Sequence, residues 1–238
     1  MATPSRSRRS TRGWICVATT EVLTRPYFGI AKQPRGFAAL LFVAALLPAL
    51  VIVPAMLSDL FLGSSWLGSD ATKAGEHLLG KWTLRLLFAT LAITPLRTLT
   101  GWNWLAKHRR TLGLFAFSYV CLHLLTWTFL DVQVLVSEYV GWADVWKDLT
   151  KRPFITIGML GFVLLVPLAL TSTRASIARM GKRWRALHRL TYVVPILGVI
   201  HYLMAVKKDI EEPLLYGAIL ATILVCRGLI ARQRAVAP

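Results

Sequence analysis

The sequence has 238 residues, of which 55% are hydrophobic and only 16% are charged. A soluble domain typically carries about 25% charged residues, so this composition excludes an ordinary soluble fold and indicates an integral membrane protein. The formal net charge of +17 does not indicate nucleic-acid binding, because the Lys and Arg residues lie between apolar runs and form no single stripe or tail.

The N-terminal segment, residues 1–35, is rich in Arg, Ser and Thr. It lacks the apolar core and the small-residue cleavage site of a secretory signal. We interpret it as a disordered, basic cytoplasmic tail, and an organelle transit peptide is the alternative interpretation. Residues 232–238 are expected to form a second, short cytoplasmic tail.

Six apolar runs are each close to the length that a helix needs to cross a hydrocarbon core of roughly 30 Å. They are residues 36–57, 76–96, 111–130, 153–171, 184–206 and 213–230. The second run carries Lys81 and Arg85 near its start. We therefore predict an all-α membrane protein, in which residues 36–231 form one bundle of six transmembrane helices.

The distribution of Lys and Arg between the loops predicts the orientation of this bundle. Most cations lie in the N-terminal segment, in the loops after the second and fourth runs, and in the C-terminal tail. The loops after the first, third and fifth runs hold fewer cations and most of the acidic residues. Because basic loops stay on the cytoplasmic side, both termini are predicted to be cytoplasmic.

Two of the five histidines, His123 and His201, are predicted to form a site. Counted from the cytoplasmic ends of their runs, they lie ~18 Å and ~19–20 Å into the membrane at 1.5 Å per residue. Ionisable groups at such a depth are costly and usually mark a site. Neutral imidazole is also a standard axial ligand of haem iron. We therefore predict that these two imidazoles hold a haem between the third and fifth helices.

His188 is predicted to serve a second site nearer the cytoplasm. It lies ~19–20 Å from His201 along the same run, whereas metal–nitrogen bonds are about 2 Å long. On an ideal helix the two side chains are also roughly 140° apart, an angle that Pro195 could change. His108 is one candidate partner for His188, although its basic surroundings also suit a solvated cluster at the lipid headgroups. His77, at the outer mouth of the second helix, is either an interfacial side chain or a ligand.

Arginines and glycines near these histidines have alternative interpretations. Arg109 and Arg110 are suited to holding a haem propionate or a flavin phosphate, or to anchoring the helix at the cytoplasmic surface. Four glycines would let a flat macrocycle approach the backbone, or would let helices pack closely. They are Gly113, Gly158, Gly161 and Gly198.

Three segments resemble the MsrQ family, the haem-binding membrane subunits of bacterial protein-methionine-sulfoxide reductase systems. They are EHLLGKWTLRLLFATLAITPLR from residue 76, RRTLGLFAFSYVCLHLLTW from residue 109, and PLALTSTRASIARMGKRWRALHRLTYVVPILGVIHYLMAVK at residues 167–207. The resemblance covers roughly residues 37–230. That family belongs to the ferric-reductase-like transmembrane group, so the resemblance implies the fold of that group.

The resemblance also implies cofactors and partners. His123, His188 and His201 match the family's histidine motif, and His77 lies in a matching HxLGxWxL context. The family implies one or two b-type haems, leaves FMN open, and implies a multi-pass protein of the bacterial inner membrane. Electrons would come from quinone or a cytoplasmic flavin reductase and pass to a periplasmic molybdopterin-dependent methionine-sulfoxide reductase subunit, in a heterodimer that supports repair of oxidised periplasmic proteins. No nucleotide-binding motif or residue set for sulfoxide reduction is apparent, so catalysis is expected on that separate subunit.

Two other classes of function are compatible with the same histidines. A ferric or other metal reductase, or an electron-transfer cytochrome b with another partner, would use the same haem ligands. A small transporter or proton channel would relay protons through intramembrane histidines, and it would be colourless when purified.

Overall fold

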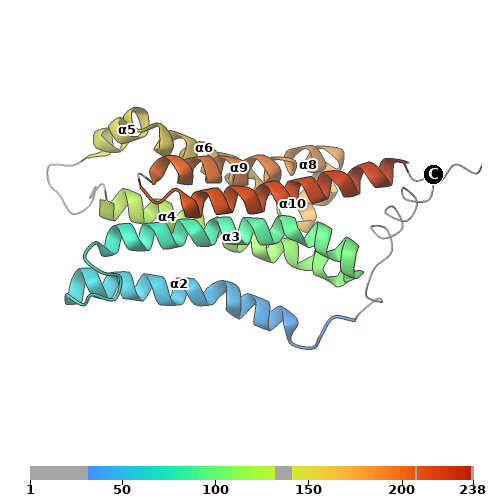
Figure 1. The fold of residues 1–238 in the computed structure, drawn as a ribbon, viewed down its shortest axis with the longest axis horizontal. Helices are drawn as coiled ribbons and strands as arrows, with labels where there is room; N and C mark the ends of the chain where they lie inside the picture. The colour runs from blue at the N-terminus through green and yellow to red at the C-terminus, as the bar shows by residue number, and fades with distance from the viewer. Residues whose placement is uncertain (1–31, 132–140, 207, 237–238) are drawn as a thin grey trace, which may run out of the picture.

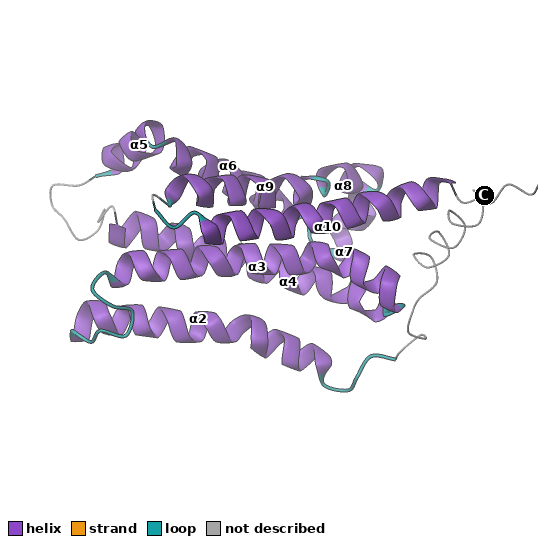
Figure 2. Cartoon of the chain, in the orientation of Figure 1, coloured by secondary structure: helices purple, strands orange, loops and turns teal. Residues whose placement is uncertain are grey.

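The computed structural model describes residues 32–131, 141–206 and 208–236, and every regular element in these ranges is helical. The predicted all-α class is confirmed for this part of the chain. Figure 2 shows the helices, with short loops between neighbouring helices inside the described ranges. In chain order the elements are α2 (Phe37–Leu62), α3 (Ala71–Thr100), the 3-10 helix η1 (Asn103–His108), α4 (Arg109–Thr126), the π-helix η2 (Trp127–Asp131), α5 (Trp142–Lys151), α6 (Pro153–Leu170), α7 (Arg174–Met180), α8 (Lys182–Leu187), α9 (Leu190–Ala205) and α10 (Glu211–Val236).

The long helices run side by side, so the bundle has two distinct ends (Figure 1). α5 and the connections from α2 to α3 and from α9 to α10 lie at one end, which we call the α5 end. η1, α7 and α8 lie at the opposite end, the α8 end. The most extensive packing joins α3 to α4 and α6 to α9. These two helix pairs carry the residues of the candidate site.

Five helical segments are long and apolar enough to cross a membrane, judged by length and composition. They are Phe37–Leu62, Asn103–Asp131, Pro153–Leu170, Lys182–Ala205 and Glu211–Gln233. The predicted multi-pass membrane protein is confirmed to this extent. The second predicted span, which corresponds to α3, is not among them because charged side chains such as Lys81 and Arg85 lower its hydropathy.

Two cations of α3, Lys81 and Arg85, have polar partners on α10. Lys81 Nζ lies 2.7 Å from a carboxylate oxygen of Glu212. Arg85 Nε donates to Tyr216 Oη at 2.8 Å, and its guanidinium lies 4.9 Å from the centre of the Trp82 ring. A cation without a partner is costly at membrane depth. These interactions explain how a charged helix packs among five apolar segments.

A buried tyrosine joins α2 to α4. Tyr119 is 1% exposed, and its hydroxyl donates to the carbonyl of Ala45 at 2.8 Å and accepts from the N–H of Ala49 at 2.9 Å. In an uninterrupted α-helix those two backbone groups would bond to each other. The hydroxyl is therefore inserted into the hydrogen-bond ladder of α2 next to Pro48, an arrangement that bends helices.

The fifth predicted span corresponds to the candidate span Lys182–Ala205, which is divided into two helices. α8 ends at Leu187, and α9 begins at Leu190. Across the break, the N–H groups of Arg189 and Thr191 bond to carbonyls three residues earlier, as in a 3-10 turn. The angle of roughly 140° derived for an ideal helix therefore does not apply. Pro195 lies inside α9 and does not end it.

Candidate functional site

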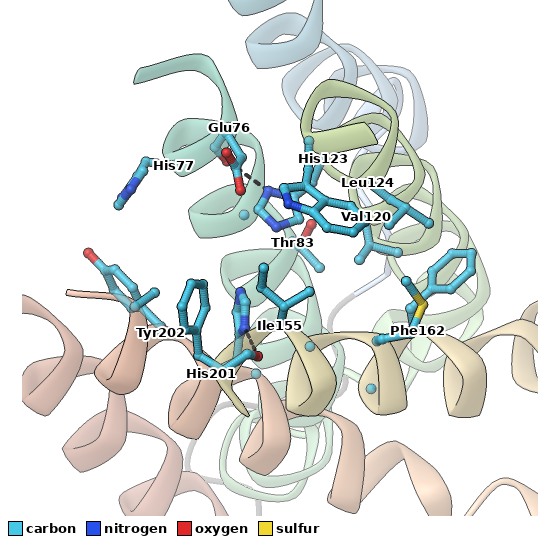
Figure 3. Close-up of a pocket in the computed structure, with 18 of the residues that line it drawn as sticks. Glu76, His77, Thr83, Val120, His123, Leu124, Ile155, Phe162, His201 and Tyr202 are labelled. Carbon is cyan, nitrogen blue, oxygen red and sulfur yellow. Dashed lines mark hydrogen bonds between the residues drawn. The ribbon is translucent and has the colours of Figure 1, made fainter. Parts of the chain in front are cut away.

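A cavity of about 1040 Å³ lies between α3, α4, α6 and α9 and extends to the α5 end of the bundle (Figure 3). Its volume is at the upper end of the range typical of small-molecule and cofactor sites. Histidines and glycines from all four helices line it: His77, Gly80, His123, Gly158, Gly161, Gly198 and His201. Charged residues line the part at the α5 end: Lys73, Asp131, Asp144, Lys147, Asp148 and Arg152. The cavity therefore combines an apolar interior with a charged mouth.

His123 of α4 and His201 of α9 face each other across this cavity, with ring centroids 6.1 Å apart and ring planes at 86° (Figure 3). The equal depth that was predicted from helical rise thus corresponds to actual proximity. Each ring is half-buried, with one side against a neighbouring helix. The two histidines are the pair that the structure brings together.

Hydrogen bonds to backbone carbonyls define the protonation of both rings. His123 Nδ1 lies 2.9 Å from the carbonyl oxygen of Glu76, and His201 Nδ1 lies 2.6 Å from that of Phe154. A carbonyl only accepts, so each Nδ1 must carry the proton. The neutral ring then has an unprotonated Nε2, the form in which imidazole binds a metal.

The separation of the two rings suits two axial ligands of one metal ion. Metal–imidazole bonds of ~2.0–2.1 Å place two opposite ligand nitrogens about 4 Å apart. Each ring centre lies about 1 Å beyond its nitrogen, so the two centroids are expected roughly 6 Å apart. The observed centroid distance is 6.1 Å. The two rings therefore lie at a distance at which both could bind one metal ion.

Glycines make room for both imidazole rings. A Cβ atom added to Gly158 would lie 2.8 Å from His201 Nδ1, closer than real Cβ contacts come. A Cβ atom added to Gly80 would lie 3.3 Å from Cε1 of His123. The rings can lie against α6 and α3 because these positions have no side chain. Both glycines therefore support the carbonyl hydrogen bonds of the histidines.

A metal bound by this pair alone would have to bring its other ligands with it. Within the described ranges no group of three or more His, Cys, Asp or Glu residues could hold a metal ion. Two imidazoles alone do not complete a tetrahedral zinc site. A haem brings four ring nitrogens and needs only one or two axial ligands from the protein. The residues present therefore fit a haem.

The other predicted histidines lie apart from this pair. His77 lines the cavity on α3 with an exposed side chain, near Glu76 in Figure 3. His188 lies at the break before α9, stacked on Trp184 with centroids 3.9 Å apart. His108 is buried against Phe37, in η1, and no ring contact joins it to His188 in the described structure. His188 Nε2 and His108 Nε2 are both buried without a hydrogen-bond partner there.

Of the two predicted arginines, Arg109 forms part of a cluster at the α8 end. Arg109 donates through Nη2 to Thr94 Oγ1, whereas the Arg110 side chain is exposed. Arg227 of α10 donates to the same Thr94 hydroxyl at 2.6 Å and to Tyr192 Oη at 2.5 Å. The Nε atoms of Arg109 and Arg227 are buried and unpartnered among the described residues. Two neighbouring guanidinium groups without a carboxylate favour binding of an anion.

Sequence reasoning did not identify Arg227 as part of this cluster, because the residue lies inside the sixth apolar run. The available signal was its charge within an apolar run, because an ionisable residue within a membrane span usually has a specific partner. Its partners, the carbonyl of Leu91 and the side chains of Thr94 and Tyr192, lie on two other helices. No spacing along α10 indicates them.

Comparison with known proteins identifies the class and then the family. Residues 79–199 match the family model described as "Ferric reductase like transmembrane component", which makes the chain a helical membrane protein of the ferric-reductase type. Three similar proteins are each called "Protein-methionine-sulfoxide reductase heme-binding subunit MsrQ". That of Rhodospirillum rubrum is 47% identical over 81% of this chain and 88% of its own length. Those of Herminiimonas arsenicoxydans and Azospira oryzae are 46% and 45% identical, over 82% and 81% of this chain and 86% and 78% of their own lengths. The chain therefore belongs to the MsrQ family, as its sequence resemblance predicted.

Proposed function

We propose that the protein is a membrane b-type cytochrome that holds a haem between His123 and His201 and carries electrons to a separate reductase subunit. The observation that carries this proposal is the facing pair itself, in which both Nδ1 atoms are committed to carbonyl groups. The relatives are named as heme-binding subunits of a protein-methionine-sulfoxide reductase, which supports the same cofactor.

The protein contributes positioning and electrostatics to this function. A bound haem would supply a centre that takes up and releases one electron. The carbonyl groups of Glu76 and Phe154 hold the two imidazoles in one tautomer and orientation. Apolar side chains such as Leu84 and Phe162 line the interior of the cavity, where they would surround the bound group. The protein thus presents two prepared ligands in an apolar interior.

We further propose that α3 is a sixth transmembrane helix and that the α8 end faces the cytoplasm. The ion pair and hydrogen bond of α3 with α10 make its charges compatible with a membrane position. The cations concentrated at the α8 end favour the cytoplasmic side, in the bacterial inner membrane. The transmembrane haem domain would span 36–231, with cytoplasmic tails at 1–35 and 232–238. Residues 1–31 lie outside the described structure.

In this proposal the electron acceptor and the electron donor bind at opposite ends of the molecule. The cavity extends to the α5 end, where a periplasmic molybdopterin-dependent methionine-sulfoxide reductase subunit would receive electrons in a heterodimer. Quinone or a cytoplasmic flavin reductase would deliver electrons at the α8 end. His188 would serve a second haem or the entry of electrons there, while His77 would act at the mouth of the cavity. The name shared by the relatives, a subunit of a reductase, supports a separate catalytic partner.

Arg109 and Arg110 are proposed to hold an anionic group of a cofactor at the α8 end, either a haem propionate or the phosphate of FMN. The unpartnered Nε atoms of Arg109 and Arg227 and their shared hydroxyl partner, Thr94, support this proposal. Arg110 is exposed and would reach the group only from the surface.

The experiment that tests the function is a visible spectrum with haem quantitation on purified protein. Wild-type protein should show a Soret band and reducible α and β bands, and His123→Ala and His201→Ala should each lose this haem. His108→Ala is the matched control, because His108 is a buried histidine outside the cavity lining. Full haem content in both cavity variants would refute the axial pair. Colourless wild-type protein, after expression with ample haem, would favour a transporter.

A further inference from the structure

Acidic and basic side chains are separated between the two ends of the molecule. Every Asp and Glu of the described chain lies in the half of the bundle at the α5 end: Asp59, Asp70, Glu76, Asp131, Asp144, Asp148, Asp209, Glu211 and Glu212. The ion pairs of Lys73 with Asp70, Lys81 with Glu212, and Arg152 with Asp148 are at that end too. The cations at the α8 end therefore have no carboxylate partner in the described part of the chain. Their counter-ions lie outside the described residues.

The densest group of these cations lies in the connection from α6 to α9, residues 171–189, which we call the α7–α8 segment. Its six cationic side chains are all exposed: Arg174, Arg179, Lys182, Arg183, Arg185 and Arg189. Exposed apolar side chains accompany them, since Ile177 is 46% exposed and Leu170, at the end of α6, is 70% exposed. The segment thus presents positive charge and apolar surface together.

The α7–α8 segment is held close to the end of the bundle. Trp184 Nε1 donates to the carbonyl of Thr171 at 3.0 Å, which ties α8 to the end of α6. Gly181 separates the two short helices with a positive φ of 53°, a backbone conformation that side chains disfavour. The connection begins and ends at segments long and apolar enough to span a membrane, Pro153–Leu170 and Lys182–Ala205. The cations therefore lie at the level where these helices would leave the membrane.

We propose that the α7–α8 segment binds the phosphate groups of anionic phospholipids, with Ile177 and Leu170 in contact with the adjoining acyl chains. Clusters of four to eight Lys and Arg beside a transmembrane helix attract anionic headgroups. Arginine also matches phosphate oxygens through paired hydrogen bonds. An acidic soluble protein would satisfy the charges, but it would leave the exposed apolar side chains in water. Charge and position at the membrane surface together favour lipid.

Lipid binding at this segment would position the residues next to it. His188 directly follows α8 and stacks on Trp184, and Trp184 belongs to the helix that carries Lys182, Arg183 and Arg185. Headgroups held by α8 would therefore fix the start of α9 and the orientation of His188. The binding itself does not depend on the proposed haem chemistry, so its failure and the failure of the cytochrome proposal are distinguishable.

The test is native mass spectrometry of the full chain with added phosphatidylglycerol or phosphatidylcholine. Three neutral replacements in the segment are compared with three at the α5 end: Arg179→Gln, Lys182→Gln and Arg183→Gln against Lys147→Gln, Lys151→Gln and Lys208→Gln. Each basic residue near an anionic surface contributes roughly fivefold in affinity, so the segment variant should bind phosphatidylglycerol about 100-fold more weakly. The control variant should keep wild-type binding. High salt should weaken the wild-type preference for phosphatidylglycerol, because the cations are exposed.

Three results would overturn the proposal. The first is a wild-type protein that binds both lipids equally at low salt. The second is an equal loss of binding in the segment variant and the α5-end variant. The third is unchanged lipid binding in a segment variant that has lost binding to an acidic soluble protein, which would assign the surface to that protein. If the segment variant does not fold, the salt dependence of the wild type is the test. A preference for phosphatidylglycerol that high salt does not weaken would then refute the proposal.

Discussion

Gly158→Ala is expected to weaken haem binding without unfolding the protein. The added Cβ would lie 2.8 Å from His201 Nδ1, and ordinary contacts begin near 3.4 Å, so the ring must move by about 0.6 Å. That movement disturbs the 2.6 Å hydrogen bond from Nδ1 to the carbonyl of Phe154. Loss of such a supporting bond typically costs 10- to 100-fold in metal affinity. Alanine otherwise favours a helix over glycine by about 1 kcal/mol, so the haem-free protein should be no less stable.

The assay is the rate of haem transfer from the purified protein to excess apomyoglobin, with thermal unfolding of the haem-free protein measured in parallel. Gly161→Ala is the matched control on the same helix, because its Cβ would lie 3.8 Å from Leu197, an ordinary contact. Gly158→Ala should lose haem at least ~10-fold faster than either wild type or Gly161→Ala. Equal haem retention in Gly158→Ala and wild type would refute the reasoning, as would equal losses in the two variants.

Three further outcomes are expected. Tyr119→Phe removes the hydroxyl inserted between two backbone groups of α2 and should lower the free energy of unfolding in detergent by about 1–2 kcal/mol. An unchanged free energy of unfolding would show that the two backbone groups bond to each other when the hydroxyl is absent. Lys81→Met removes the cationic partner of Glu212, so it should lower the unfolding midpoint more than the double variant Lys81→Met with Glu212→Leu. Equal midpoints would mean that the pair is not coupled. Arg109→Gln should reduce the cofactor content, measured by haem and flavin analysis, more than Arg110→Gln does. Of these two arginines only Arg109 has a buried, unpartnered Nε. Equal cofactor content in both variants would contradict an anion site at Arg109.

The candidate haem ligands were predictable because a helix rises by a fixed distance per residue. Once the cytoplasmic ends of the runs are placed, this rise alone puts His123 and His201 at one depth, and the structure brings them together. Their carbonyl partners could not be predicted in this way. They depend on how closely α3 approaches α4 and α6 approaches α9, and Gly80 and Gly158 determine that approach.

The prediction missed the break in the fifth span because nothing in the sequence marks it. In the run at residues 184–206 the break falls at His188 and Arg189, where there is no Gly or Pro. That break depends on 3-10 turns and on the hydrogen bond of Trp184 to the end of α6. The role of Arg227 could not be predicted either, because its partners lie on other helices and not along α10.

The most direct test of the central claim is electron paramagnetic resonance of the ferric protein, for wild type and for His123→Ala and His201→Ala. Two imidazole ligands on one iron produce a low-spin signal, and ring planes at 86° predict the strongly anisotropic form of that signal. Each single variant should lose this signal and show high-spin iron or no haem. The same low-spin signal in both variants would contradict a haem held between His123 and His201.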